Sequence, residues 1–201
     1  PGGTVAGVTE LAAEIYAARG VKPIVAHVNA MAASAAYWIA SAADSIVSTP
    51  SGSVGSVGIV VAHTDSTAAD AREGVTREVI SAGKYKAEGF GPLTDESRAA
   101  LQSRVDDAYT TMTADIGRGR GVTAKAVRAG FGEGRVVSAS QAKDLGMIDR
   151  IATLDETIAR LQARRAVSGL RAEAHEELDA ILDHAATEAD RDRARRLRLV
   201  L

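Results

Sequence analysis

The sequence contains no cysteine, and this absence removes several kinds of chemistry at once. Without thiols the chain has no disulfide, no cysteine nucleophile and no zinc–thiolate site. Its four histidines, His27, His63, His175 and His184, are scattered without the spacing of metal ligands. We therefore expect neither a metal site nor thiol chemistry.

Long apolar runs and an excess of either charge are also absent. The formal net charge is −2, and no basic stripe is interleaved with aromatic residues, so nothing indicates a nucleic-acid partner. No stretch approaches the roughly 18 apolar residues of a membrane span. Hydrophobic residues nevertheless make up 46% of the chain, which is enough for one soluble α/β domain with an appendage.

The chain begins with Pro1-Gly2-Gly3 and has neither an initiator methionine nor a signal peptide. We therefore expect it to be a fragment of a longer protein whose beginning is missing. The lack of a targeting signal here excludes nothing for the parent protein.

Helical and strand-like patterns alternate through the first 152 residues. Apolar spacing, caps and glycines predict helices over 8–19, 34–43, 68–72 and 94–116, from 123, and over 138–146. Strands are predicted over 24–28, 46–48, 59–62, 75–80 and 147–151, with a short extended piece at 133–137 and a glycine-rich loop at 49–58. This order favours an α/β domain over residues 1–152, with a sheet covered by helices on both faces.

From residue 153 to 201 the composition shifts to alanine, arginine, glutamate and leucine, which predicts a helical tail. The first interpretation is a solvated helix that packs on its own domain or on a sister chain. Short apolar stripes leave a coiled-coil, oligomerisation or scaffold-like arm as the alternative. The stripes are Leu154, Ile158 and Leu161, then Leu178, Ile181 and Leu182; basic residues gather at Arg191, Arg193, Arg195, Arg196 and Arg198.

Ser34 stands among small apolar residues, where the strand over 24–28 gives way to a helix. The first N–H groups of a helix are free to stabilise a developing negative charge, so a nucleophile is favoured at such a junction. A serine hydroxyl also needs a base and oxyanion donors to react. From these residues alone, a cap or packing role is the commoner interpretation.

Two kinds of base could activate Ser34. His63 and Asp65 would complete a Ser-His-Asp arrangement, although a strand residue is the commoner explanation for this histidine. Lys84 and Lys86 stand in a glycine-bounded loop, and a lysine held in an apolar pocket can act as a base near neutral pH.

A series of short motifs runs in order along the chain. The motifs are PGG at 1–3, MAASAAYWIASAAD at 31–44, TP at 49–50, GSVGSVGI at 52–59, AGKYK at 82–86, RGRG at 118–121, and GRVV at 134–137 followed by Ala142 and Leu145-Gly146. From residue 1 to about residue 160, this series resembles the signal peptide peptidase A (protease IV) family. The resemblance implies the Clp-protease/crotonase-like fold. It also implies a serine–lysine dyad that needs no cofactor and acts on protein or peptide substrates.

The resemblance assigns roles to particular residues. Ser34 matches the nucleophile and Lys86 the general base, with Lys84 as the fallback. Ser56 matches a serine that orients the lysine, and Ser53 is the alternative alignment. The oxyanion donors would be the Ala35 backbone N–H and the turn containing Gly2 and Gly3. The family pattern also places a strand before Pro1.

The family contains several branches with different substrates and partners. Ala35-Ala36 stands where most cellular members carry Gly-Gly, and together with Tyr37-Trp38 and the charged tail it resembles the phage capsid-assembly proteases related to minor capsid protein C. That branch implies scaffold, portal or capsid substrates in the host cytoplasm. The alternatives are a cellular signal-peptide-degrading enzyme without its membrane anchor, and a non-proteolytic assembly scaffold. The Ser34 and Lys86 motifs argue against an acyl-CoA enzyme of the same fold. The family also implies a homo-oligomeric ring or dome, with active sites shared across subunit interfaces.

Overall fold

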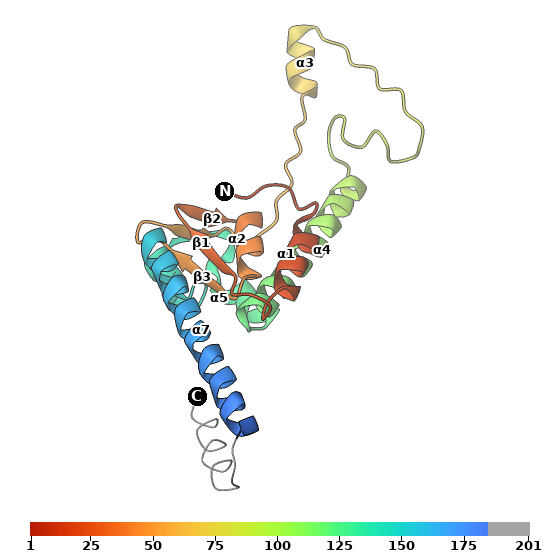
Figure 1. Cartoon of the computed structure of the whole chain (residues 1–201). Helices are drawn as coiled ribbons and strands as arrows, with labels where there is room; N and C mark the ends of the chain where they lie inside the picture. The colour runs from red at the N-terminus through yellow and green to blue at the C-terminus, as the bar shows by residue number, and fades with distance from the viewer. Residues whose placement is uncertain (185–201) are drawn as a thin grey trace. The chain divides into compact units, whose positions relative to one another are not determined.

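The computed structural model describes residues 1–184, which fall into two compact units (Figure 1). The first unit is Pro1–Ile151, and the second begins at Ala152. The described part of the second unit contains one long helix, α7 (Leu154–His184), whose start carries a capping box between Thr153 and Glu156. The basic cluster from Arg191 to Arg198 lies outside the described residues. None of the helices described through residue 184 is long and apolar enough to cross a membrane.

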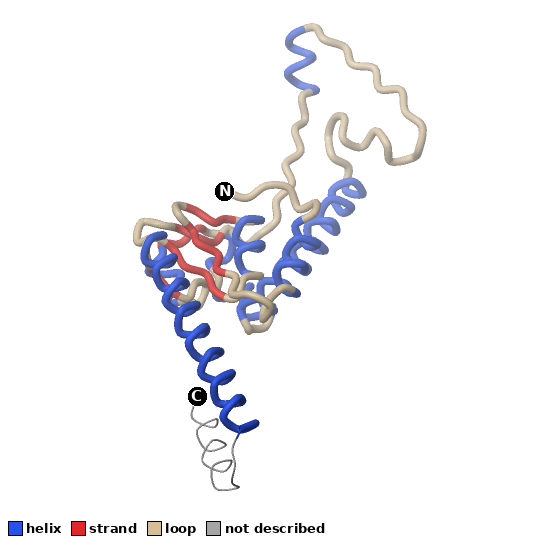
Figure 2. The backbone as a smooth tube through the Cα atoms, in the orientation of Figure 1, coloured by secondary structure: helices blue, strands red, loops and turns tan. Residues whose placement is uncertain are grey.

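Two three-stranded sheets form the centre of the first unit (Figure 2). One sheet is parallel throughout, in the order β1 (Val25–Val28), β3 (Ser45–Ser48), β6 (Arg150–Ile151). The other has the order β2 (Met31–Ala33), β4 (Ser53–Gly55), β5 (Val136–Ser138), in which β2 and β4 are parallel and β5 is antiparallel to β4. The predicted single sheet was therefore wrong in this detail, because the strands divide between two sheets.

The helices of the first unit begin and end largely where local signals predicted. They are α1 (Val8–Ala17), α2 (Ala35–Ser41), α3 (Thr67–Glu73), α4 (Asp95–Arg120), α5 (Ala124–Gly130) and α6 (Ala139–Asp144), with a 3₁₀ turn at Gly132–Gly134. Thr94, Thr123 and Ser138 each accept a hydrogen bond from a first-turn backbone N–H at their helix start. Helix α4 ends later than predicted, at a left-handed Gly121.

The core is centred on α2 and α4. Tyr37 and Trp38 of α2 and Met112 and Ile116 of α4 are fully buried, together with Ile46 of β3. Burial of each large apolar side chain contributes roughly 1.5–3 kcal/mol. These contacts fix the position of α2, which begins directly after Ser34.

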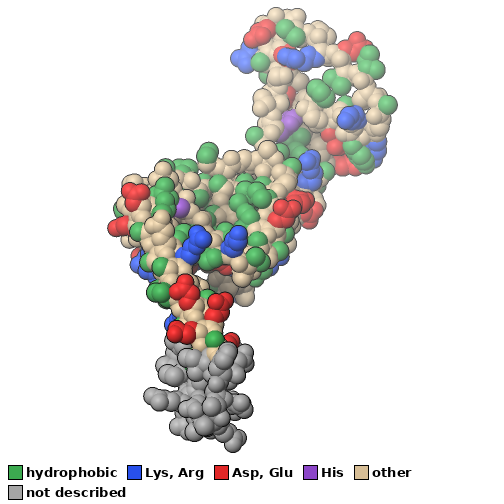
Figure 3. Space-filling model, viewed as in Figure 1, with side chains coloured by type: hydrophobic (Ala, Val, Ile, Leu, Met, Phe, Trp, Pro, Cys, Tyr) green, Lys and Arg blue, Asp and Glu red, His purple; other side chains and the backbone are tan. Residues whose placement is uncertain are grey.

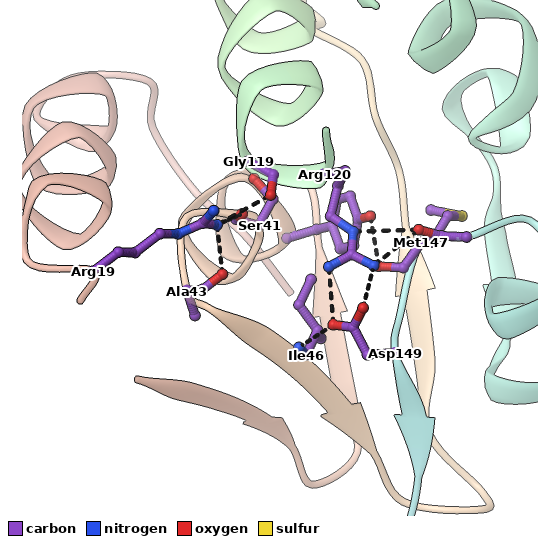
Figure 4. Close-up of polar contacts among 10 residues, drawn as sticks. Arg19, Ser41, Ala43, Ile46, Gly119, Arg120, Met147 and Asp149 are labelled. Carbon is purple, nitrogen blue, oxygen red and sulfur yellow. Dashed lines mark hydrogen bonds and ion pairs between the residues drawn. The ribbon is translucent and has the colours of Figure 1, made fainter. Parts of the chain in front are cut away.

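Arg19 forms hydrogen bonds at the C-terminal end of α2 (Figure 4). Its guanidinium donates to the carbonyl oxygens of Ser41, Ala42 and Ala43 at the end of that helix, and to Gly119 of α4. A Cβ at Gly119 would lie 2.1 Å from the Ser41 carbonyl oxygen, so the crossing of the two helices requires glycine. Trp38 adds a hydrogen bond of 3.1 Å from its indole nitrogen to Asp115.

A second polar cluster joins α4 to β3 (Figure 4). Arg120 donates two hydrogen bonds, of 2.8 and 2.9 Å, to the carboxylate of Asp149. Asp149 also accepts the Ile46 backbone N–H at 2.7 Å. Burial raises the pKa of Asp149, but the hydrogen bonds from Arg120 and Ile46 and the nearby positive charges outweigh burial and lower that pKa. Nearby, the Tyr37 hydroxyl donates to the Met147 carbonyl, and burial raises the pKa of this phenol.

Two predicted strands were wrong. Residues 59–62 and 75–80 have no regular secondary structure. Both lie on the segment 59–94, between β4 and α4, which carries α3 and which we call the excursion (Figure 1). Val60 and Ile80 are 90% and 91% exposed, and their apolar, β-type pattern has no partner strand among residues 1–184. The strand predicted over 147–151 is reduced to β6, and β2 and β4 were not predicted.

Candidate active site

Ser34 occupies a strained junction between β2 and α2. It is the N-cap of α2, with φ 53° and ψ −125°, in a region that residues with a side chain seldom adopt. Its N–H donates to the Gly55 carbonyl at 2.8 Å, and its carbonyl accepts the Trp38 N–H at 3.0 Å. Such strain costs about 1–3 kcal/mol and persists where the surrounding structure enforces it, which is common at active sites.

Ser56 stands beside Ser34 at the end of the neighbouring strand. Strands β2 and β4 are parallel, and Ala33 pairs with Gly55, so each serine directly follows a paired residue. Ser56 also has a positive φ, of 51°, and its N–H donates to the Arg135 carbonyl at 2.8 Å. Both serines are partly exposed. The alternative residue, Ser53, pairs with Met31 at the opposite end of these strands, so the register favours Ser56 as the neighbour of Ser34.

Gly2 lies against the backbone of this junction. A Cβ at Gly2 would lie 2.8 Å from both the Ala33 carbonyl oxygen and the Ser34 Cβ, and 3.3 Å from the Ala35 nitrogen. Its φ of +107° also favours glycine. Gly3 differs, because a Cβ there would meet nothing within 4 Å. The structure therefore brings Gly2, Ser34, Ala35 and Ser56 together, and Gly3 follows without a comparable close approach.

The two lysines of the AGKYK motif lie on the excursion and differ in their partners. The Lys84 ammonium is 2.6 Å from the Tyr85 hydroxyl and 3.7 Å from a carboxylate oxygen of Glu96. The Lys86 side chain is exposed and makes no hydrogen bond or ion pair with any residue among 1–184, Ser34 included. Within this part of the chain, only the Lys86 backbone N–H is bonded, to the Gly83 carbonyl. Lys84 is thus occupied by an ion pair, whereas Lys86 is available to another partner.

His63 and Asp65, the alternative base and its orienting carboxylate, have other partners. His63 Nε2 is 2.8 Å from the Gly91 carbonyl oxygen. Asp65 accepts hydrogen bonds from the backbone N–H and hydroxyl of Thr67, and the backbone bond is the main cause of its lowered pKa. Within residues 1–184, no contact joins this pair to Ser34, so the structure does not assemble a Ser-His-Asp arrangement.

An apolar groove lies between the N-terminal segment, the start of the excursion and α4. Its lining includes Val5, three consecutive residues from Ile59 to Val61, and Leu101 and Val105 of α4. Val5 follows Gly2 by three residues, and Ile59 follows Ser56 by three. The groove therefore shares two chain segments with the serine junction. In the described part of the chain, no group of three or more metal-binding side chains occurs.

The sequence alone missed two features that bear on this site. The first is the hydrogen bond from the Ser34 N–H to the Gly55 carbonyl, which depends on β2 and β4, two strands of three residues each. The second is Glu96, whose only visible signal was its position in the first turn of a capped helix.

Comparison with known proteins identifies relatives for this arrangement. The chain is 32% identical over 160 residues to capsid assembly protease C of Escherichia phage lambda, covering 79% of this chain and 36% of that protein. It is 29% identical over 167 residues to protease 4 of Salmonella typhi, covering 80% of this chain and 26% of that protein. The chain spans less than two thirds of the length of the first curated relatives that it matches.

A solved structure shows the same fold. A mutant of 1510-N membrane-bound stomatin-specific protease aligns with a TM-score of 0.52 at 15% identity, covering 79% of this chain and 64% of that one. This likeness and the named relatives confirm the predicted Clp-protease/crotonase-like fold class and the resemblance to the protease IV family. The family model described as peptidase family S49 matches residues 17–168. With three quarters of its length matched by that model, the chain belongs to peptidase family S49.

Proposed function

We propose that residues 1–152 form the protease domain of a serine endopeptidase, with Ser34 as nucleophile and Lys86 as general base. The observation that carries the proposal is the strained Ser34 at the end of β2, with Ser56 beside it and Gly2 against its backbone. Membership of a peptidase family supports the reaction class. Residues from 153 onward would serve as a helical oligomerisation or scaffold-linked arm.

The proposed reaction is acyl transfer through an acyl-enzyme. Neutral Lys86 takes the proton from Ser34 Oγ, and the alkoxide attacks the scissile carbonyl carbon. The backbone N–H of Ala35 and the turn of Gly2 and Gly3 would stabilise the oxyanion, while Ser56 would orient the lysine ammonium. Lys86 then donates the proton to the leaving amine, and water deprotonated by the same lysine releases the acyl group. No step calls for a cofactor.

We further propose that Lys86 reaches Ser34 of a neighbouring copy in a homo-oligomer. Within one chain, Lys86 lies on the excursion, whose surface carries hydrophobic side chains (Figure 3). Val60 is 90% exposed, Ile80 91% and Phe90 67%, which is costly for a segment that stays in water. Packing of this excursion on a second copy would cover these side chains and deliver the lysine at the same time.

Phage head or scaffold proteins are the substrates that we propose, in the cytoplasm of the host cell. The support is similarity to a protein named capsid assembly protease C. Similarity to protease 4 favours a second candidate, a cellular peptidase that degrades signal peptides. The groove lined by Val5, Ile59 and Leu101 suits apolar substrate side chains in either case.

The test compares wild-type protein with Ser34→Ala, Lys86→Ala and the matched control Lys84→Ala. Each is incubated with an unfolded protein substrate from about pH 6 to about pH 10, a range whose upper end approaches the ordinary pKa of a lysine amine. Mass spectrometry identifies the cleavage products. Cleavage should rise with pH, vanish in the first two variants and persist in Lys84→Ala. Cleavage that survives in Ser34→Ala would overturn the proposal. A folded wild type that cuts neither this substrate nor its co-expressed head proteins would favour a non-proteolytic scaffold.

The shared site has its own test. Ser34→Ala and Lys86→Ala are each inactive alone, but a mixture whose subunits exchange contains sites with both an intact Ser34 and an intact Lys86. Partial recovery of activity is therefore expected on mixing. Mass-labelled subunits show whether exchange occurred, and exchanged mixtures without activity would contradict a site shared between copies.

A further inference from the structure

We propose that Glu96 and Tyr85 are positioning residues for Lys86, and this inference rests on the proposed function of Lys86 as the base. Glu96 lies in the first turn of α4, and Tyr85 directly precedes Lys86 in the sequence. Neither residue would touch the substrate. Their effect would be to hold the lysine-bearing turn in one place relative to α4.

A chain of polar contacts connects the turn to the helix. Lys84 Nζ donates to the Tyr85 hydroxyl at 2.6 Å, and that hydroxyl donates to Glu96 Oε1 at 2.8 Å. The Lys84 ammonium is also 3.7 Å from Glu96 Oε1 and 4.5 Å from the centre of the Tyr85 ring. Three side chains therefore form one cluster, which we call the Glu96 tether.

The Glu96 tether acts on Lys86 through a tight turn. The Lys86 N–H donates to the Gly83 carbonyl at 3.1 Å, and Gly83 has a φ of +102°. Lys84 and Tyr85 are the two residues inside this turn. Because both are held by Glu96, the direction in which the chain leaves the turn at Lys86 is fixed as well.

Helix α4 holds the Glu96 tether in place. Its start is capped by Thr94, and Ser97 beside Glu96 is buried. Toward its other end, the same helix contacts α2 through the Trp38–Asp115 hydrogen bond and the approach of Gly119 to Ser41. One continuous helix thus connects the lysine turn to the helix that begins after Ser34. In each chain, helix α4 therefore positions both the turn that carries Lys86 and the helix that begins after Ser34.

The tether also gives the two lysines different surroundings. The Lys84 ammonium contacts the Tyr85 hydroxyl and the Glu96 carboxylate, which hold that side chain against the start of α4. The Lys86 side chain is exposed and makes no such contact in the described part of the chain. This geometry supports Lys86, rather than Lys84, as the proposed base.

The experiment compares Glu96→Ala and Tyr85→Phe with Asp95→Ala. The control removes a carboxylate from the same helix turn, and the Asp95 side chain makes no hydrogen bond or ion pair among the described residues. Tyr85→Phe keeps the ring and removes only the bridging hydroxyl. Two readouts are used: kcat and KM on an unfolded protein substrate, and amide hydrogen exchange of the segment 83–88.

The expected result is specific to kcat. Glu96→Ala and Tyr85→Phe should lower kcat about threefold to fivefold with KM unchanged, the size that exposed polar pairs produce. Amide exchange over 83–88 should become faster in both. Glu96→Gln should recover most of the activity, because its side-chain carbonyl still accepts the Tyr85 hydroxyl. Asp95→Ala should match wild type in both readouts.

The possible failures are distinguishable. Equal kcat and equal exchange in Glu96→Ala and Asp95→Ala would overturn the positioning role, as would a change confined to KM. In either case Ser34→Ala and Lys86→Ala would still be inactive, so the proposed function would stand. Retained activity in Lys86→Ala would instead refute the proposed function, and the positioning role would fall with it.

Discussion

Gly2 offers the sharpest test of how closely the N-terminal segment must approach Ser34. In Gly2→Ala the new Cβ would lie 2.8 Å from both the Ala33 carbonyl oxygen and the Ser34 Cβ. Ordinary van der Waals contact begins near 3.4 Å, so the segment has to retreat by about 0.6 Å, and alanine also disfavours the φ of +107°. Misplacement of catalytic groups by 1 Å can cost about 100-fold, so kcat/KM should fall about 10-fold to 100-fold.

Gly130→Ala, at the end of α5, is the control for this prediction. It adds the same methyl group where nothing lies within 4 Å, at a residue with no role in the proposed site. Its activity should stay within about twofold of wild type, as for other substitutions away from the site. Initial cleavage rates measure the effect, and thermal unfolding shows that both variants are folded. Equal activity in Gly2→Ala and Gly130→Ala would refute the role that we give to the Gly2 approach.

Three further predictions concern stability and assembly. Gly119→Ala places a Cβ 2.1 Å from the Ser41 carbonyl oxygen and should lower the free energy of unfolding by about 1–3 kcal/mol in urea titrations, whereas Gly130→Ala, with nothing within 4 Å, should not destabilise the fold. Because the pKa of Asp149 is lowered in the folded state, its carboxylate stabilises the fold above its unfolded pKa of about 3.9, and this contribution is lost as the pH falls through the folded value. Asp149→Asn should therefore destabilise the protein at neutral pH, with a smaller difference from wild type at about pH 3; an equal difference at both pH values would contradict this linkage. If copies share the active site, specific activity should fall on dilution in step with the oligomer measured by light scattering, and constant specific activity in dissociated protein would argue against sharing.

The elements that the sequence predicted well are those whose stabilising contacts are local. Thr94, Thr123 and Ser138 cap helices through backbone groups three residues away, so their signals lie within one turn of the sequence. Strands β1 and β3 were visible as short β-type apolar runs. Strands β2 and β4 were not, because each has three residues and is defined by pairing between segments about twenty residues apart.

The excursion shows the opposite error. Residues 59–62 and 75–80 have the composition of strands, but a strand also needs a partner, and the described part of the chain offers none. Their apolar pattern is explained more simply if it serves contacts with another copy, as the proposed oligomer requires. A sequence pattern reports that a segment is suited to burial, without reporting which chain buries it.

The residues of the candidate site also differ in how much of their arrangement the sequence could predict. Motif resemblance nominated Ser34, Ser56, Gly2 and Ala35, and the structure brings these four together through strand register and the close approach of Gly2. The resemblance matched Lys86 to the general base, with Lys84 as the fallback. The structure adds that Glu96 pairs with Lys84, a contact that no motif contains.

The two halves of the proposed dyad are prepared to different degrees within one chain. The serine half is built by the fold itself, because the strained backbone of Ser34 is held by Gly55 and Trp38. Lys86 lies on the exposed excursion, which the Glu96 tether connects to α4. A chain arranged in this way keeps its nucleophile in place but lacks the base until Lys86 meets a serine, so assembly of copies would itself switch on cleavage. Proteolysis would then be confined to places where the protein is concentrated, as a growing assembly provides.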